Sequence, residues 1–218
     1  MSEETIMVLV RVSLFSPLLP LSILLLKRKS ASGFVWRALF VFLVVSFGCD
    51  YGGRALGLNG ITNMPVIHVY NVLIGTIICY YYYRMLQHRK MKVIIRWLFF
   101  IFLFVSTSEF FYQNGYLTFN TVSTWTINVL TIFFTLVWFY QVFFSEEQMK
   151  LTKLPEFWVN VGFFFYFGST MVLTLFSEMI LYTGGNHELT MKLWPIQLVT
   201  NIVFNLIILR AVWALKRA

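Results

Sequence analysis

The segment RKMKVIIRWLFFIFLFVSTSEFFYQ, residues Arg89–Gln113, decides the fold class of this chain. After a basic start it continues as an almost uninterrupted apolar stretch from Val93 to Gln113. A helix needs about 20 apolar residues to cross the hydrocarbon core of a bilayer. The segment meets that length, and it is therefore predicted to be a transmembrane helix that begins beside a cluster of cations.

Six further stretches of the same character fill most of the chain. Hydrophobic residues make up 59% of the 218 residues and charged residues only 12%, whereas a soluble domain carries about 25% charge. The chain is therefore predicted to be an all-α, polytopic membrane protein in which residues 1–218 form a single seven-helix transmembrane domain. The predicted helices are Thr5–Leu26, Gly33–Tyr51, Pro65–Tyr83, Val93–Gln113, Thr118–Phe144, Phe157–Tyr182 and Leu193–Leu215.

Basic residues gather on one side of the predicted helices. Of the 17 lysines and arginines, all but Arg11, Arg54 and Lys192 fall at the same set of helix ends. By the positive-inside rule that side is cytoplasmic, so the N-terminus is expected outside and the C-terminus inside. The net charge of +8 is thus a topology signal and does not indicate nucleic-acid binding. The expected location is a bacterial inner membrane, with the basic rim favouring anionic lipid headgroups.

Turn-forming residues and prolines mark the ends and irregularities of these helices. Pro17 and Pro20 lie inside the first helix and are predicted to kink it. Cys49 and Cys79 are interpreted as packing residues and not as a disulfide. Turns are predicted at Gly52-Gly53, Asn59-Gly60, Asn114-Gly115 and Gly184–Asn186.

Charged residues inside the predicted helices indicate where function would lie. A charge near the bilayer centre costs about 2.5–3.5 kcal/mol on insertion scales, so each is expected to face the bundle and find a partner. Asp50 and Arg54 are four residues apart and can pair along one helix face, while Arg11 can meet Glu109 or Glu178 across the bundle. Such pairs would either fix the helix order or belong to an outward-facing cavity that binds a ligand.

Uncharged polar residues extend this pattern at helical spacing. Examples are Gln197, Asn201 and Asn205 in the last helix, and Asn160, Phe164, Phe167, Met171 and Thr174 in the sixth. Polar contacts between helices explain such stripes as readily as a binding site does. The Tyr80–Tyr83 run points around its whole helix and marks no site. The residues predicted to line a ligand cavity are Arg11, Asp50, His68, Glu109, Asn128, Glu178, Gln197 and Asn201.

Enzymatic and cofactor chemistry finds no support in the sequence. The three histidines, His68, His88 and His187, are dispersed and form no metal-ligand motif. The last helix has no central lysine for a retinal Schiff base, and the chain lacks the Pro-Gln pairs of one class of seven-helix sugar transporters. No catalytic residue, metal site or cofactor is therefore predicted.

Two stretches carry a resemblance to a known group of proteins. LPEFWVNVGFFFYFGS at Leu154–Ser169 and NIVFN at Asn201–Asn205 resemble uncharacterised seven-helix membrane proteins of Bacteroidetes-type bacteria. The resemblance covers mainly the last two helices. Genes for that group often lie beside, or fused to, those of sensor histidine kinases, so the resemblance implies a sensory role with a separate output partner such as a histidine kinase.

Three functions follow from these observations. The first is a receptor-like protein that senses a small ligand in its outer half and signals through a partner inside. The second is an accessory or scaffold subunit of a larger membrane complex, and the third is a small-solute transporter. A receptor should contain an internal pocket, whereas an accessory subunit should be tightly packed inside.

The orientation is testable by cysteine labelling of intact cells. A membrane-impermeant maleimide is expected to modify Asn186→Cys but not Lys90→Cys, because the basic links should face the cytoplasm. The reverse labelling pattern would overturn the orientation.

Overall fold

Seven membrane-length helices make up the structure, which is a computed structural model. It describes residues 3–27, 31, 33–144, 151–182 and 187–215, although not the side chains of residues 3, 113–114, 177–182 and 187–192. The helices are α1 (Glu3–Phe15), α2 (Leu18–Leu26), α3 (Phe34–Leu58), α4 (Met64–Met85), α5 (Arg89–Phe111), α6 (Thr121–Phe143), α7 (Pro155–Tyr182) and α8 (His187–Trp213), with 3-10 helices η1 (Tyr112–Leu117) and η2 (Leu151–Lys153). In the described residues, α1 and α2 together form one of seven candidate membrane spans. The predicted all-α, seven-helix class is confirmed.

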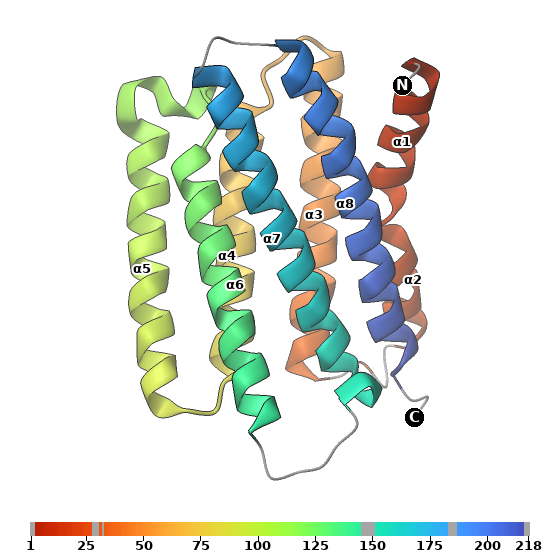
Figure 1. Cartoon of the computed structure of the whole chain (residues 1–218), viewed down its shortest axis with the longest axis vertical. Coiled ribbons are helices and arrows are strands. Elements are labelled where there is room, and N and C mark those ends of the chain that lie inside the picture. Colours follow the sequence, from red (N-terminus) through yellow and green to blue (C-terminus); the bar gives the residue numbers. More distant parts are fainter. Residues whose placement is uncertain (1–2, 28–30, 32, 145–150, 183–186, 216–218) are drawn as a thin grey trace.

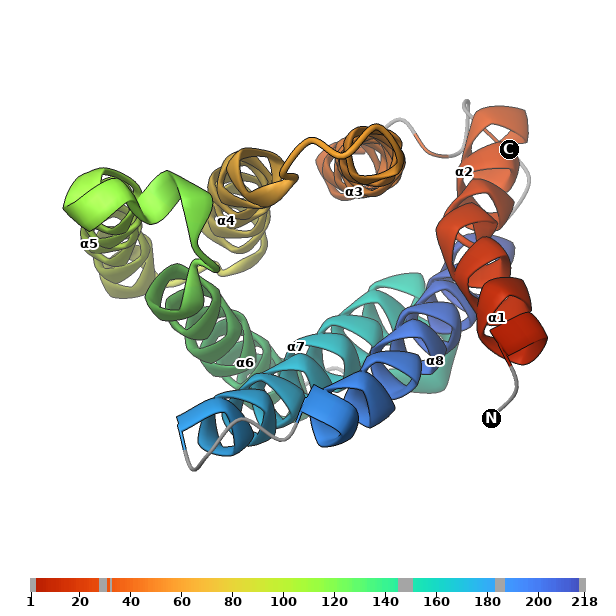
Figure 2. The same cartoon turned by 90° about the horizontal axis from the view of Figure 1, so that it is seen from above.

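The spans alternate in direction and stand in a ring (Figure 1). The N-terminus and the links after α3 and α5 lie at the upper end in Figure 1, here called the N-terminal end of the bundle. The opposite, C-terminal end holds the links after α2 and α4. Viewed from above, α3, α4 and α5 face α7 and α8, while α6 and the α1–α2 pair close the two sides (Figure 2). This order brings the first and last spans together.

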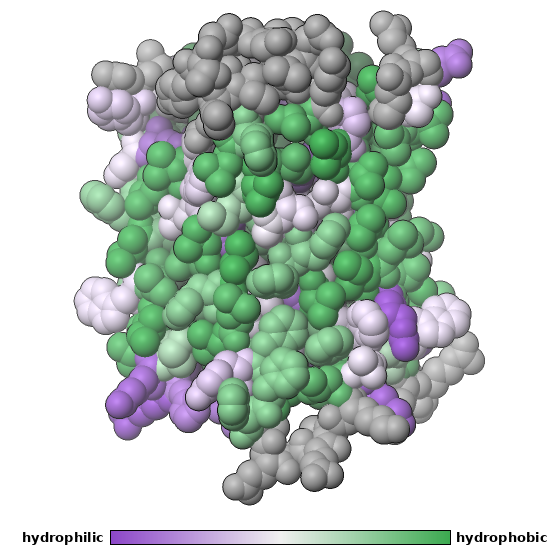
Figure 3. Space-filling view, in the orientation of Figure 1, coloured by the Kyte–Doolittle hydropathy of each residue, from purple (hydrophilic) through white to green (hydrophobic). Residues whose placement is uncertain are grey.

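The outer surface has the pattern of a protein embedded in a bilayer. On the face shown in Figure 3 a broad apolar belt crosses the middle, and hydrophilic residues gather at the C-terminal end. The cations of that end include Lys27 at the end of α2, Arg84 in the last turn of α4 and Arg89 at the start of α5. The basic segments are therefore collected at one end, as the sequence predicts, while the side of the membrane to which that end belongs stays a prediction.

The predicted kink in the first span is a complete break at Pro17, and Pro20 lies within α2. Proline has no N–H, so the carbonyl of Ser13 loses its helical partner. Two side chains replace it: Ser16 Oγ donates to Ser13 O at 2.8 Å, and Asn201 Nδ2 on α8 donates to the same oxygen at 3.3 Å. The break thus ties the first span to the last.

The prediction of a turn at Gly52-Gly53 is wrong. These glycines lie inside α3, which continues to Leu58. Glycine is tolerated in membrane helices, where the helix is the conformation that pairs every backbone polar group. The turn comes instead at the predicted Asn59-Gly60 pair, where Gly60 has a φ of 71°, a left-handed conformation that favours glycine.

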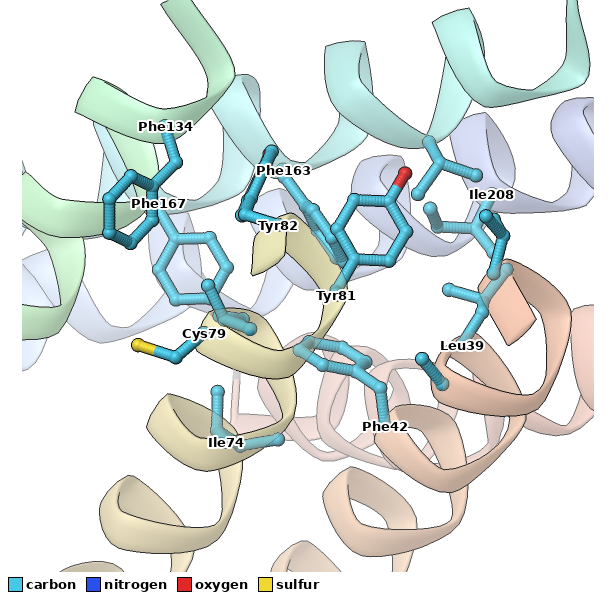
Figure 4. Close-up of a cluster of buried hydrophobic side chains, with 14 of the residues drawn as sticks. Leu39, Phe42, Ile74, Cys79, Tyr81, Tyr82, Phe134, Phe163, Phe167 and Ile208 are labelled. Carbon is cyan, nitrogen blue, oxygen red and sulfur yellow. The ribbon is translucent and has the colours of Figure 1, made fainter. Parts of the chain in front are cut away.

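Large aromatic side chains fill the C-terminal half of the bundle. Phe42 lies against Phe163 and Phe204, with ring centroids 5.3 and 5.8 Å apart, so α3, α7 and α8 meet there. Tyr81 packs edge-on to Phe163 at 5.5 Å and brings in α4 (Figure 4). Burial of aromatic rings in such offset and edge-on pairs stabilises helix contacts, and it makes this half the packed core.

A polar network runs through this aromatic core. The Tyr82 hydroxyl donates to Asn160 Oδ1 at 2.9 Å and lies 2.6 Å from Thr135 Oγ1. Asn160 Nδ2 in turn donates to the Tyr81 hydroxyl at 3.2 Å and to the Glu156 carbonyl at 2.9 Å. Although the Tyr80–Tyr83 run points around the whole helix, two of its members join α4 to α6 and α7.

Lys27 closes the ring at the C-terminal end. Its Nζ donates to the carbonyls of Trp213 at 2.8 Å and Leu215 at 2.7 Å. These carbonyls have no helical partner because α8 ends there, and a cation at a helix C-terminus also interacts favourably with the helix dipole. The end of α2 is therefore held against the end of α8.

Removal of the Tyr82 hydroxyl is expected to destabilise the bundle. Tyr82→Phe would leave the buried Asn160 Oδ1 without its donor, at a cost of about 1 kcal/mol. The midpoint of thermal unfolding in detergent should fall for Tyr82→Phe and stay unchanged for the matched control Tyr80→Phe, whose ring is 49% exposed. Equal midpoints for the two variants would contradict this role.

Candidate ligand cavity

The N-terminal half of the bundle is hollow where the C-terminal half is packed. One space, here called the polar cavity, has a volume of about 520 Å³ and lies between α1, α3, α4, α7 and α8. Its lining includes Asp50 and Arg54 from α3, Tyr70 from α4, and Gln197 and Asn201 from α8. The volume is within the range of about 300–1,000 Å³ that is typical of small-molecule sites.

A second space, here called the apolar cavity, has a volume of about 640 Å³ and lies between α4, α6, α7 and α8. Ile74, Ile127, Phe167 and Leu173 give it a mainly hydrophobic wall. Asn128 adds one polar group, and its Nδ2 is buried with no hydrogen-bond partner among the described residues. A buried donor without a partner is costly, and a ligand acceptor in this cavity would satisfy it.

The two cavities share a wall. Tyr70, Tyr166, Trp194 and Gln197 line both of them. The Tyr166 hydroxyl lies near those of Tyr70 and Thr170, and Gln197 Nε2 donates to Thr170 Oγ1 at 3.3 Å. Hydroxyl and amide groups are therefore placed where a polar cavity meets an apolar one.

Small residues on α3 keep the polar cavity open. Gly53 and Gly57 lie on its wall one helical turn apart. A Cβ added at Gly57 would meet no atom within 4 Å, and one at Gly53 would meet only Asn63. The glycines that suggest a turn in the sequence thus leave space beside a continuous helix.

Four of the eight predicted site residues lie on these cavities. Asp50 and Asn201 line the polar cavity, Asn128 lines the apolar cavity, and Gln197 lines both. A ligand-binding role for each of them stays a prediction.

His68 lies elsewhere, against the link between α5 and α6. Its Nε2 is 2.9 Å from the Gly115 carbonyl and 3.2 Å from the Thr118 carbonyl. The residue is buried and faces a separate pocket of about 230 Å³ between α4 and α5. The expectation that it shares the cavity is wrong, because it fixes η1 to α4.

Glu109 is a helix cap and does not line either cavity. From the last turn of α5 it accepts the backbone N–H groups of Val122 at 2.9 Å and Ser123 at 2.8 Å, together with the Ser123 hydroxyl. These N–H groups belong to the first turn of α6, where no preceding turn of the helix offers a carbonyl acceptor. The N-cap residue itself, Asn120, makes no side-chain cap there and donates to the Ile67 carbonyl instead.

The predicted ion pairs are absent from the described part of the chain. Arg11 is exposed and lines neither cavity. No described carboxylate lies within 4.0 Å of Arg11 or of Arg54. Glu178 lies in α7, but its side chain is outside the described residues, so its predicted pairing and site role have no counterpart here.

The aromatic residues of the shared wall are not among those predicted from the sequence. The predicted inward stripe of α7 includes Phe164, which is 42% exposed, whereas Tyr166 lines both cavities. The other predicted members Asn160 and Phe167 are buried, and Thr174 lines the apolar cavity. Because nearly every residue of this segment is apolar or aromatic, its periodicity is weak and does not separate Phe164 from Tyr166. Tyr70 precedes Asn71 on a predicted apolar helix, and neighbouring positions of a helix do not share a face, so the sequence gives no signal for it.

Comparison of the chain with known protein families, with curated proteins and with solved structures gave no match. The candidate site therefore rests on its geometry: a two-part cavity, polar toward α1 and α3 and apolar toward α6, in the N-terminal half of a seven-helix membrane bundle.

The Glu109 cap can be tested by a double-mutant cycle. Glu109→Gln and Ser123→Ala are each expected to lower the unfolding free energy by about 0.5–2 kcal/mol, because each removes part of the same cap. The double variant should lose less than the sum of the two single losses. Strict additivity in thermal or denaturant unfolding would show that the two side chains do not act together.

Proposed function

We propose that this protein is a receptor-like membrane protein that binds a small amphipathic ligand across the polar and apolar cavities. The observation that carries the proposal is the pair of adjoining cavities, of about 520 and 640 Å³, inside the N-terminal half of the bundle. A receptor needs internal space for its ligand, whereas an accessory subunit held by its neighbours does not.

The linings indicate the chemistry of the ligand. Asp50 and Arg54 place an acidic and a basic group in the polar cavity with no ion pair between them, so a ligand head with hydrogen-bonding or charged groups suits this side. The apolar cavity fits a hydrocarbon or aromatic portion, and Asn128 offers it an amide donor that has no partner among the described residues. A ligand that fills both spaces would pass Tyr70 and Tyr166 at the shared wall.

A route from the cavity to the opposite end of the bundle is available through α8. Asn201 lines the polar cavity and also donates to Ser13 Oγ at 3.0 Å, beside the break in the first span. Four residues further on, Asn205 donates to Ser16 Oγ at 2.9 Å. A ligand that displaces Asn201 would change contacts at the break, and Lys27 links α2 to the end of α8 where a partner would dock. A change in the population of two bundle states would transmit the signal.

With the predicted N-out orientation, the cavities face the outside of an inner membrane, and the partner, such as a histidine kinase, lies in the cytoplasm. The partner, the membrane and the sensory role are parts of the same proposal.

An accessory-subunit role is the alternative, and it predicts co-purification of a stable membrane complex without a bound small molecule.

The proposal predicts that the purified protein carries a small amphipathic molecule. Native mass spectrometry in mild detergent should detect a non-covalent adduct, and organic extraction should release it for identification. Asn128→Leu, which keeps the side-chain size but removes the donor, should raise the dissociation constant by about 10-fold, as expected for one hydrogen bond of 1–2 kcal/mol, and so lower adduct occupancy.

The matched control is Asn59→Leu. Asn59 is exposed at the end of α3, and its side chain donates to the Ala55 carbonyl at 2.8 Å, away from both cavities. This variant should keep full occupancy. Equal adduct loss in the two variants, or no adduct in the wild-type protein purified from native membranes, would count against the receptor reading.

A further inference from the structure

A small fourth pocket lies beneath the polar cavity, close to the middle of the bundle. We call it the inner pocket. It is enclosed by the break at Pro17 in the first span and by α3, α4, α7 and α8. Its polar lining comes from Ser46, Asp50, Asn201 and Asn205, together with the hydroxyl-bearing Tyr70 and Tyr166. The volume in which the centre of a water molecule could lie is about 10 Å³. This is room for roughly one water or one small ion.

The orientation of Asn205 is fixed by its own hydrogen bonds. Its Nδ2 donates to Ser16 Oγ at 2.9 Å, to the Asn201 carbonyl at 2.9 Å and to Asn201 Oδ1 at 3.2 Å. Both amide hydrogens are therefore in use, and the opposite amide orientation would lose all three contacts. The acceptor, Asn205 Oδ1, is left without a hydrogen-bond partner although the residue is only 3% exposed.

Two further oxygens of the inner pocket come from one face of α3. Ser46 Oγ is buried and lies near the Tyr70 hydroxyl, so a hydroxyl lone pair stays available on the pocket side. Asp50 follows one helical turn later and lines both the inner pocket and the polar cavity. No described cation pairs with its carboxylate, although the residue is exposed toward the polar cavity. A charge without a partner within a membrane helix is costly.

We propose that the inner pocket binds a sodium ion, with the Asp50 carboxylate, Asn205 Oδ1 and Ser46 Oγ as protein ligands. Hard cations prefer carboxylate, amide and hydroxyl oxygens, and the inner pocket offers one of each, of which Asn205 Oδ1 is buried with no hydrogen-bond partner. One carboxylate matches one positive charge, whereas dedicated Ca²⁺ sites use several carboxylates. The one-water size of the pocket favours a small cation over a large one.

The site is reached from the polar cavity, because Asp50, Tyr70, Tyr166 and Asn201 line both spaces. A bound sodium ion would neutralise Asp50 and hold α3 against α8 beside the break in the first span. The inference stands on the inner pocket alone and does not require a ligand in the larger cavities.

The test is thermal unfolding of the purified full-length protein in detergent at constant ionic strength. Sodium chloride should raise the midpoint by a few degrees over choline chloride in a saturable manner, since an ion that binds only the folded state stabilises it. Potassium chloride should raise it less. Equal midpoints in sodium and choline chloride would overturn the proposal.

Variants assign the effect to the pocket. Asp50→Asn keeps the side-chain shape and should abolish the sodium-dependent shift, and Ser46→Ala should raise the half-saturating sodium concentration by about 10-fold. Glu109→Gln is the matched control: it removes a carboxylate at a helix cap and should keep the full shift from a lower starting midpoint. If Asp50→Asn does not fold, the Ser46→Ala titration decides, and an unchanged half-saturating concentration overturns the assignment.

Discussion

The structure depends on one constraint: in hydrocarbon, a backbone N–H or C=O without a partner has no water to bond. Seven helices satisfy nearly all of these groups, and the exceptions occur where a helix breaks or ends. At three of these places a side chain from another helix supplies the bond. Asn201 reaches the carbonyl freed by Pro17, Glu109 the first N–H groups of α6, and Lys27 the last carbonyls of α8.

This constraint separates two kinds of polar residue that look alike in the sequence. His68 and Glu109 are held by backbone groups of a neighbouring element, so they join helices and have little freedom to bind anything else. Asp50 and Asn128 have no such backbone group to satisfy, and they line internal space. A polar residue that lies beside an unpaired backbone group joins helices, and one without such a neighbour stays available to line the cavities.

The two halves of the bundle differ in a way that suits a ligand-responsive protein. In the C-terminal half, aromatic rings and the Tyr82–Asn160 network fill the interior and resist rearrangement. In the N-terminal half, the first span is broken and α3 carries glycines on the cavity wall. A change of contact at the cavity would therefore act on the less densely packed half and reach the other end through α8 and the break.

The sequence by itself determined the seven spans, the gathering of cations at one end and the irregularity at Pro17, because length, hydropathy and a missing N–H act locally. It also identified Asp50, Asn128, Gln197 and Asn201 as polar residues of the N-terminal half. Only the tertiary structure decided that α3 continues through Gly52-Gly53, that Tyr166 and not Phe164 faces inward, and that Glu109 caps α6. Each of these depends on which backbone group or side chain of a distant helix lies opposite, and the spacing along one helix does not contain that information.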